Sequence, residues 1–207
     1  MSTMAASNTI PDAARAPLRP ISFGGPAVRV ERRDDGTIYV RPTAALVDYP
    51  RRLTDRLHHW AGLEPNRVFM AERVADVGWR TITYAQLLDA SRHVASALLA
   101  RGLSAERPVM ILSGNSIDHA LLAFGAFYAG IPFCPVSPAY SLVSKDYGKL
   151  SFVMKLLTPG LVFAADATQF ADALVANVPA DVEIVAVRGA VPGRAVTPLA
   201  ELLATPQ

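Results

Sequence analysis

The chain is poor in cysteine, in long apolar runs and in any excess of one charge. Its 207 residues include one cysteine, Cys134, so no disulfide can form within the chain. The apolar surroundings of Cys134, residues 131–136, favour a buried side chain over a nucleophile. The longest apolar stretch, residues 120–129, is too short to cross a bilayer, and residues 1–20 lack the apolar core of a signal peptide. We therefore expect a cytoplasmic protein without a membrane span.

The charge distribution excludes two further classes of protein. The formal net charge is +2, and the basic residues are scattered rather than gathered into a stripe. This pattern is not that of a nucleic-acid-binding protein. None of the four histidines, at positions 58, 59, 93 and 119, stands at metal-ligand spacing from a partner. We therefore expect that the chain binds no nucleic acid and that its histidines bind no metal ion.

The motifs that announce phosphate binding or nucleophilic catalysis are also missing. The sequence has no G-x-x-x-x-G-K-[ST], no G-x-G-x-x-G and no G-x-S-x-G. Residues 24–26, Gly-Gly-Pro, are too few to cradle a phosphate, and a hairpin rather than a helix follows them. The paired carboxylates Asp34 and Asp35 are better read as turn formers. Pattern alone thus assigns no catalytic or cofactor-binding residue.

The first third of the chain predicts hairpins around a short helix. We expect residues 1–22 to form a disordered tail and residues 23–207 to form the folded part. Strand-forming residues flank Asp35-Gly36 in a hairpin over residues 28–40, and a second hairpin covers residues 67–83. Between them, Pro50 opens a helix that Gly62 ends. Thr83 and Gln86 have the spacing of a capping box at the start of a longer helix that Gly102 stops.

From residue 108 onward, strands and helices alternate. Such alternation predicts βαβ units and a mainly parallel sheet with helices on both faces, so the fold class is α/β. The expected helices begin at the caps Asn115 and Ser144 and at Thr168, and the last helical turns cover residues 198–203. The expected strands are 108–112, 133–136, 161–164 and 182–187.

Two loops that leave strands carry polar side chains where a ligand could bind. In an open parallel sheet, ligands bind at the carboxyl ends of the strands. Residues 113–116 also offer a helix N-terminus to an anion, although an ordinary turn capped by Asn115 explains them equally. Residues 137–141 either line a cleft or form a rigid connection set by the neighbouring prolines. The candidate crevice-lining residues are Asn115, Ser116, Ser137 and Tyr140.

Two segments in a fixed order resemble the core motifs of AMP-forming acyl-CoA synthetases, the adenylate-forming ligases. Residues 82–87, Ile-Thr-Tyr-Ala-Gln-Leu, resemble the first motif, with Gln86 where the family usually has Glu. Residues 127–136, in which an Ala-Gly helix end leads into an apolar strand and a proline, resemble the second. Ala105-Glu106-Arg107 replaces the family's common Gly-Asp-Arg turn. Residues 135–142 and 156–164 look most like feruloyl-CoA synthetases.

This resemblance implies a two-step ligation in the parent protein. A carboxylic acid would attack the α-phosphate of ATP to give an acyl-adenylate, and the thiol of CoA would then take the acyl group and release AMP. The family's catalytic segments follow the second motif, and the 207 residues contain no Ser/Thr/Gly-rich loop with a lysine. No catalytic residue is therefore carried over, and ATP, Mg²⁺ and CoA are implied for the parent alone.

Two alternatives to a ligase fragment remain open at this point. A truncated paralogue could serve as a non-enzymatic binding or dimerisation module, and self-association through exposed core surface fits either interpretation. An unrelated nucleotide-binding α/β protein is disfavoured by the missing glycine-rich loop. We expect residues 23–207 to be the N-terminal α/β subdomain of a ligase, inactive without the remainder.

Overall fold

The computed structural model describes residues 27–75 and 77–207, which divide into two units at Tyr49/Pro50. The expected tail over residues 1–22 and the Gly-Gly-Pro segment at residues 24–26 lie outside the described residues. The first unit contains one hairpin, in which β1 (Val28–Arg32) pairs antiparallel with β2 (Ile38–Pro42). Gly36 adopts φ +85° in the turn, and the Thr37 amide donates to the Asp35 carboxylate at 2.9 Å. The predicted Asp-Gly hairpin is thus confirmed.

The second unit begins with a helix whose ends differ from those predicted. Helix α1 (Leu53–Leu63) starts three residues after Pro50, where the Asp55 carboxylate accepts from the Arg52 amide at 3.0 Å. The prediction that Gly62 ends this helix is wrong. Gly62 keeps an ordinary helical conformation, and the Glu64 amide still donates to the Trp60 carbonyl at 2.8 Å. Glycine ends a helix only when it turns into the left-handed region, and Gly62 does not.

The second hairpin leads directly into the longest helix of this unit. Strand β3 (Val68–Val74) pairs antiparallel with β4 (Gly78–Thr83), and α2 (Tyr84–Ala100) follows without a loop. The Gln86 amide donates to Thr83 Oγ1 at 3.3 Å, while the Thr83 amide donates to Gln86 Oε1 at 2.9 Å. Gly102 has φ +64° just beyond the helix. The capping box and the glycine stop are both confirmed.

A five-stranded parallel sheet forms the centre of the second unit. Its spatial order is β6-β5-β7-β8-β9, and every neighbouring pair is parallel, which confirms the predicted α/β fold class. The short last strand was not predicted. The strands are β5 (Val109–Ile111), β6 (Phe133–Pro135), β7 (Leu161–Asp166), β8 (Glu183–Arg188) and β9 (Thr197–Pro198).

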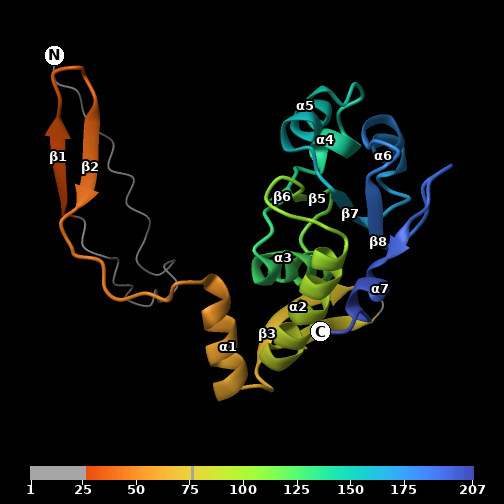
Figure 1. Cartoon of the computed structure of the whole chain (residues 1–207), viewed down its shortest axis with the longest axis horizontal. Helices are drawn as coiled ribbons and strands as arrows, with labels where there is room; N and C mark the ends of the chain where they lie inside the picture. The colour runs from red at the N-terminus through yellow and green to blue at the C-terminus, as the bar shows by residue number, and fades with distance from the viewer. Residues whose placement is uncertain (1–26, 76) are drawn as a thin grey trace, which may run out of the picture. The chain divides into compact units, whose positions relative to one another are not determined.

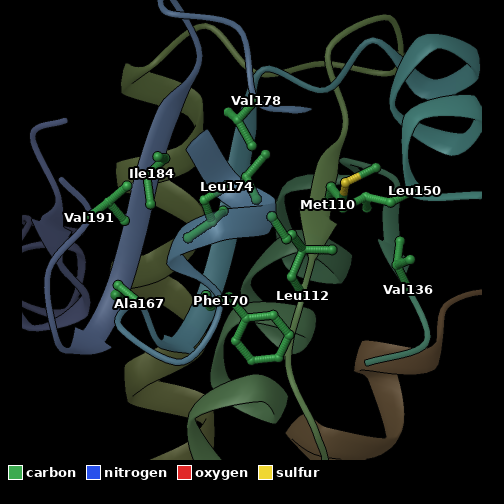
Figure 2. Close-up of a cluster of buried hydrophobic side chains, with 14 of the residues drawn as sticks. Met110, Leu112, Val136, Leu150, Ala167, Phe170, Leu174, Val178, Ile184 and Val191 are labelled. Carbon is green, nitrogen blue, oxygen red and sulfur yellow. The ribbon is translucent and has the colours of Figure 1, made fainter. Parts of the chain in front are cut away.

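Helices cover both faces of this sheet. On one face lie α2, α3 (Ile117–Ala129) and α7 (Leu199–Leu203), and on the other lie α5 (Gly148–Leu157) and α6 (Ala171–Asn177) (Figure 1). Successive strand residues point to opposite faces, so Val109 and Met110 belong to different core clusters. Figure 2 shows the cluster that contains Met110, in which Met110 of β5 lies beside Leu150 of α5.

Two predicted helix caps are displaced. Ser116, not Asn115, caps α3, since its hydroxyl accepts from the His119 amide at 3.0 Å. Ser144 does not cap the next helix, because its hydroxyl donates to Asp146 Oδ1 at 2.7 Å, and that carboxylate accepts from the Gly148 amide at 3.1 Å. A short helix not predicted from the sequence, α4 (Ala139–Leu142), lies in the loop before α5. Within the described residues, no helix has both the length and the apolar character of a membrane span.

Candidate functional site

The topology of the sheet opens a crevice where the direction of the chain reverses. The chain runs from β5 through α3 to β6 at one edge, then returns through α4 and α5 to β7 on the other side of β5. Helix α3 covers one face of the sheet, whereas α5 and α6 cover the other. The loops that leave β5 and β7 therefore diverge toward opposite faces. Such a switch point, at the carboxyl ends of the strands, is where ligands bind in open α/β sheets.

A cavity of about 280 Å³ occupies this position. The predicted residues Asn115 and Ser116 line it, but Ser137 and Tyr140 do not. The loop after β6 contributes Pro138 and Leu142 instead. Tyr140 packs against the core cluster beneath α5, and Lys149 Nζ lies 5.3 Å from the centre of its ring. The remaining lining residues are Ser113, Gly114, Ala165, Asp166, Gln169, Phe170 and Arg188.

Asp166 is the acidic side chain of this cavity, and it is held in one orientation. Its Oδ1 accepts from the backbone amides of Thr168 at 3.1 Å and Gln169 at 3.2 Å, and its Oδ2 accepts from Arg188 Nε at 2.9 Å. Partial burial works against ionisation. The Gln169 amide and the Arg188 guanidinium outweigh it and hold the pKa of Asp166 below its ordinary value. The opposite charges of Asp166 and Arg188 therefore neutralise each other in this part of the wall.

The loops that carry this pair are tied together. Thr168 Oγ1 accepts from the Ala190 amide at 3.0 Å, and Gly189 in the loop after β8 has φ +87°. A Cβ at position 189 would lie 2.6 Å from the Thr168 amide nitrogen, so only glycine allows this approach. The wall formed by the ends of β7 and β8 is thus built for rigidity.

The other wall begins at the N-terminus of α3, which the protein's own carboxylate occupies. Glu72 of β3 accepts from the Ile117 amide at 2.9 Å and from Arg80 at 3.0 Å. Arg80 also donates to both oxygens of Asp118 at 2.7 Å, and this bidentate contact raises the pKa of Arg80. The second hairpin is thereby fastened to α3. Since Glu72 and Ser116 already use the Ile117 and His119 amides, the anion site suggested for residues 113–116 is partly filled.

The crevice residues do not fit a triphosphate or its magnesium ion. A triphosphate needs free amides and a free cation, but two amides at the start of α3 are engaged and Arg188 is paired with Asp166. Mg²⁺ needs oxygen ligands with open positions, and the Asp166 oxygens are both in use. Within residues 27–75 and 77–207, no cluster of three or more acidic, histidine or cysteine side chains could hold a metal ion. What the crevice offers is a shaped, mostly neutral wall.

The family model for AMP-binding enzymes matches residues 57–201, which include the capped start of α2 and the whole switch point. The chain belongs to the AMP-binding enzyme family. The match confirms the superfamily predicted from the two core motifs. It does not show specificity for a feruloyl group.

Relatives of this AMP-binding domain are much longer than the chain itself. The L-2-aminoadipate reductase large subunit of Eremothecium gossypii is 32% identical over 127 residues, covering 54% of this chain and 9% of that protein. The chain therefore spans far less than two thirds of the curated relative that it matches.

Solved structures show the same fold at low identity. The fatty acyl-adenylate ligase of L. pneumophila, solved with acyl adenylate and pyrophosphate, has 20% identity and a TM-score of 0.54, covering 74% of this chain and 24% of its own. McyG A-PCP, complexed with phenylalanyl-adenylate, has 20% identity and a TM-score of 0.57, covering 78% and 27%. The N-terminal domain of FACL13 from Mycobacterium tuberculosis has 21% identity and a TM-score of 0.57, covering 76% and 37%.

A larger cavity of about 670 Å³ lies at the opposite end of the strands, away from the switch point. The C-terminal ends of α5 and α6 meet there, and helix C-termini disfavour anions. Arg194 donates to the carbonyls of Val178, Pro179 and Val182 at 2.8 to 2.9 Å beside it. Cavity size favours this end of the strands, whereas the general rule for open α/β sheets favours the smaller crevice at the switch point.

Proposed function

We propose that the chain is the N-terminal α/β part of an adenylate-forming enzyme that activates a carboxylic acid with ATP as its acyl-adenylate. The observation that carries the proposal is the match to AMP-binding enzymes over residues 57–201, the segment that forms the parallel sheet and its switch-point crevice. The crevice supports it because it is concave, bordered by rigid loops and placed where this sheet type takes ligands.

In this proposal the chain supplies one wall of the acid-binding crevice. Asn115 and Ser116 present polar groups at the mouth, and Phe170 and Leu142 add apolar surface on which the body of an acid can rest. Ser137 and Tyr140 support the loop after β6 without lining the cavity. Because Arg188 neutralises Asp166, this wall would not repel the carboxylate of a bound acid.

We further propose that the acid is aromatic and feruloyl-like and that CoA accepts the acyl group. The support is the likeness of residues 135–142 and 156–164 to feruloyl-CoA synthetases. A cytoplasmic location belongs to the same proposal, because the enzyme would draw there on ATP and CoA.

ATP, Mg²⁺ and CoA would be held by parts of the enzyme other than these residues. ATP would supply the α-phosphate, Mg²⁺ would neutralise the phosphate charge, and CoA would supply the acceptor thiol. Because the crevice residues do not fit phosphates or Mg²⁺, the 207-residue chain alone has no adenylating activity in this proposal.

The first test is ATP–pyrophosphate exchange with the purified 207-residue chain. We expect no exchange with ferulate, with a fatty acid or with an amino acid. The second test is to read the gene beyond the codon for Gln207 and to express the longer frame. We expect a Ser/Thr/Gly-rich loop with a lysine and exchange that is fastest with ferulate. Exchange by the 207 residues would overturn the inactivity, and faster exchange with a fatty or amino acid would overturn the aromatic substrate.

Variants of the longer protein test the role of the crevice. Asn115→Leu should raise KM for the acid severalfold with little change in KM for ATP, because the side chain lines the acid crevice alone. Asn66→Leu, an exposed change in the loop before β3, serves as the matched control and should leave both values unchanged. Equal effects of the two substitutions would contradict this assignment.

A non-enzymatic binding or dimerisation module is the second candidate. It is favoured by the position of β6 at one end of the sheet and by the nearby Phe127, whose ring is half exposed. A stop codon directly after Gln207, together with a dimer in sedimentation equilibrium that Phe127→Ser abolishes, would support this candidate over the ligase.

A further inference from the structure

Helix α5 turns an apolar stripe toward solvent. Phe152 and Leu156 lie one turn apart on its outer side and are 66% and 69% exposed. Val143, at the end of α4, is 75% exposed. The opposite side of α5 is committed to the core through Leu150 and Met154, which are buried. Helix α5 therefore has apolar side chains on both sides, although only one side has a partner in the described structure.

Lysines flank this stripe. The whole chain contains three lysines against seventeen arginines, and all three stand within eleven residues, at positions 145, 149 and 155. At 3.6 residues per turn, Lys149 and Lys155 fall on either side of Phe152 on the helix surface. All three lysines are exposed, and within the described residues none lies within ion-pair distance of a carboxylate. We call the exposed side chains of Val143, Lys145, Lys149, Phe152, Lys155 and Leu156 the α5 patch.

The charge of the α5 patch indicates the sign of the charge that its partner carries. Asp146 is the one acidic residue between positions 143 and 156, so the segment carries a net charge of +2. The Asp146 carboxylate is engaged by the Ser144 hydroxyl and the Gly148 amide. Two copies of this patch would bring lysines against lysines, which disfavours a second copy of the chain as the partner. The partner must be anionic and must accept apolar side chains.

The choice of lysine over arginine narrows the partner further. Protein–protein interfaces are enriched in arginine and depleted in lysine, since a desolvated lysine loses strong hydration. A lysine can instead lay its apolar stem along a surface and keep its ammonium in water among phosphate groups. An apolar stripe bordered by lysines is the arrangement of helices that lie in the plane of a membrane interface.

We propose that the α5 patch docks on an anionic lipid surface, with Phe152, Leu156 and Val143 entering the acyl boundary and the three lysines among the headgroups. The helix lies parallel to the membrane plane, and its inner side stays in the protein core. Each lysine near an anionic surface strengthens binding about fivefold, and the attraction weakens as salt screens it. The contact is therefore reversible and does not depend on the proposed catalytic function.

Vesicle co-sedimentation of the 207-residue chain tests this proposal. We expect the chain to pellet with vesicles of phosphatidylcholine and phosphatidylglycerol at 7:3, and to stay in the supernatant with pure phosphatidylcholine. Phe152→Ser with Leu156→Ser should lower the partition coefficient at least tenfold, and Lys149→Gln about fivefold. Both substitutions change exposed side chains, and far-UV circular dichroism with thermal unfolding verifies that the variants fold.

Matched controls lie elsewhere on the same chain. Leu99→Ser removes an exposed apolar side chain from α2, and Arg73→Gln removes an exposed cation from β3; both should bind vesicles as the unchanged chain does. Equal loss in the controls and in the α5 variants would overturn the proposal, as would equal binding to neutral vesicles. If the chain binds neither kind of vesicle but binds polyglutamate through the same lysines, the proposal is overturned and the partner is an acidic protein. A dimer that Phe152→Ser dissolves would overturn it in favour of a second copy.

Discussion

Replacing Gly125 by alanine tests how closely α2 and α3 approach each other. Gly125 is buried in α3, and a Cβ at this position would collide with Val94 Cγ1 and lie 2.6 Å from Val94 Cβ. Carbon atoms are at their best separation near about 3.5 to 4.0 Å, so the two helices must move apart or Val94 must move. Val94 is fully buried and β-branched, which leaves its side chain few alternatives. Rotation about χ1 also cannot relieve the contact with Val94 Cβ.

The size of the effect follows from two opposing contributions. Alanine favours the helix over glycine by about 1 kcal/mol, whereas inserting a methyl group into a filled core costs roughly 1 to 3 kcal/mol or more. The contact here is severe and the neighbour is stiff, so we expect the upper part of that range. Gly125→Ala should therefore lower the free energy of unfolding by about 2 kcal/mol. Gly62→Ala, in α1 with no heavy atom within 4 Å of the new Cβ, should raise it by up to about 1 kcal/mol.

Urea unfolding followed by circular dichroism measures both variants and a double mutant. Val94→Ala alone should cost about 2 kcal/mol, from two lost methyl groups and the cavity they leave. In the double mutant the contact with Val94 Cγ1 is gone, although the contact with the Cβ at position 94 remains, so the combined loss should fall short of the sum by about 1 kcal/mol. Additive losses within about 0.5 kcal/mol, or an unchanged midpoint for Gly125→Ala, would refute the close approach of these helices.

Two further substitutions test the cap and the crevice. Thr83→Ala removes the acceptor of the Gln86 amide and should cost about 1 kcal/mol in urea unfolding, whereas Thr83→Ser should keep most of it; equal losses would contradict the cap. Asp166 has a folded-state pKa below its ordinary value of about 3.9, so it stabilises the fold above that pH and the gain is lost as the pH falls through the folded pKa. Asp166→Asn should lower the urea midpoint at pH 7 and flatten its fall between about pH 5 and 2; an unchanged pH profile would count against the Arg188 pairing.

The sequence predicts this fold well where one local interaction decides the structure. The capping box of Thr83 and Gln86 needs only four consecutive residues, and the stop at Gly102 needs only a left-handed glycine. The central apolar strands β5 and β7 are equally plain, because their side chains are buried on both faces of the sheet. These features were correctly predicted without any knowledge of tertiary contacts.

Helix starts were mispredicted where several polar residues compete for one amide. Asn115 and Ser116 are both good caps, and the structure uses the second because its hydroxyl reaches the His119 amide. Ser144 has the residue type of a cap, but its hydroxyl donates to Asp146. The Asp146 carboxylate accepts from the Gly148 amide instead. Preference for a residue type does not say which of two neighbours has the right backbone geometry.

Two of the four candidate crevice residues line the cavity, and the sheet register explains why its charged pair was not predicted. Asn115 and Ser116 follow one strand directly and could be found by reading along the chain. Asp166 and Arg188 end two different strands and meet because those residues are paired in register across β7 and β8. An acidic residue that ends one apolar strand and a basic residue that ends the next parallel strand form a readable signal, once the strands are known to be neighbours.

The start of α3 shows why the nature of the crevice could not follow from sequence. A helix N-terminus after a strand predicts an anion site, and the dipole argument for it is sound. Glu72, far earlier in the chain, lies on a hairpin that folds over this helix and takes the Ile117 amide for its own carboxylate. Arg80 then joins Glu72 to Asp118, so its single guanidinium is already shared by two carboxylates at the helix start. In the proposed adenylating enzyme, the phosphates would therefore need donors from elsewhere in the protein, and these residues would contribute the shape of one wall to the acid crevice.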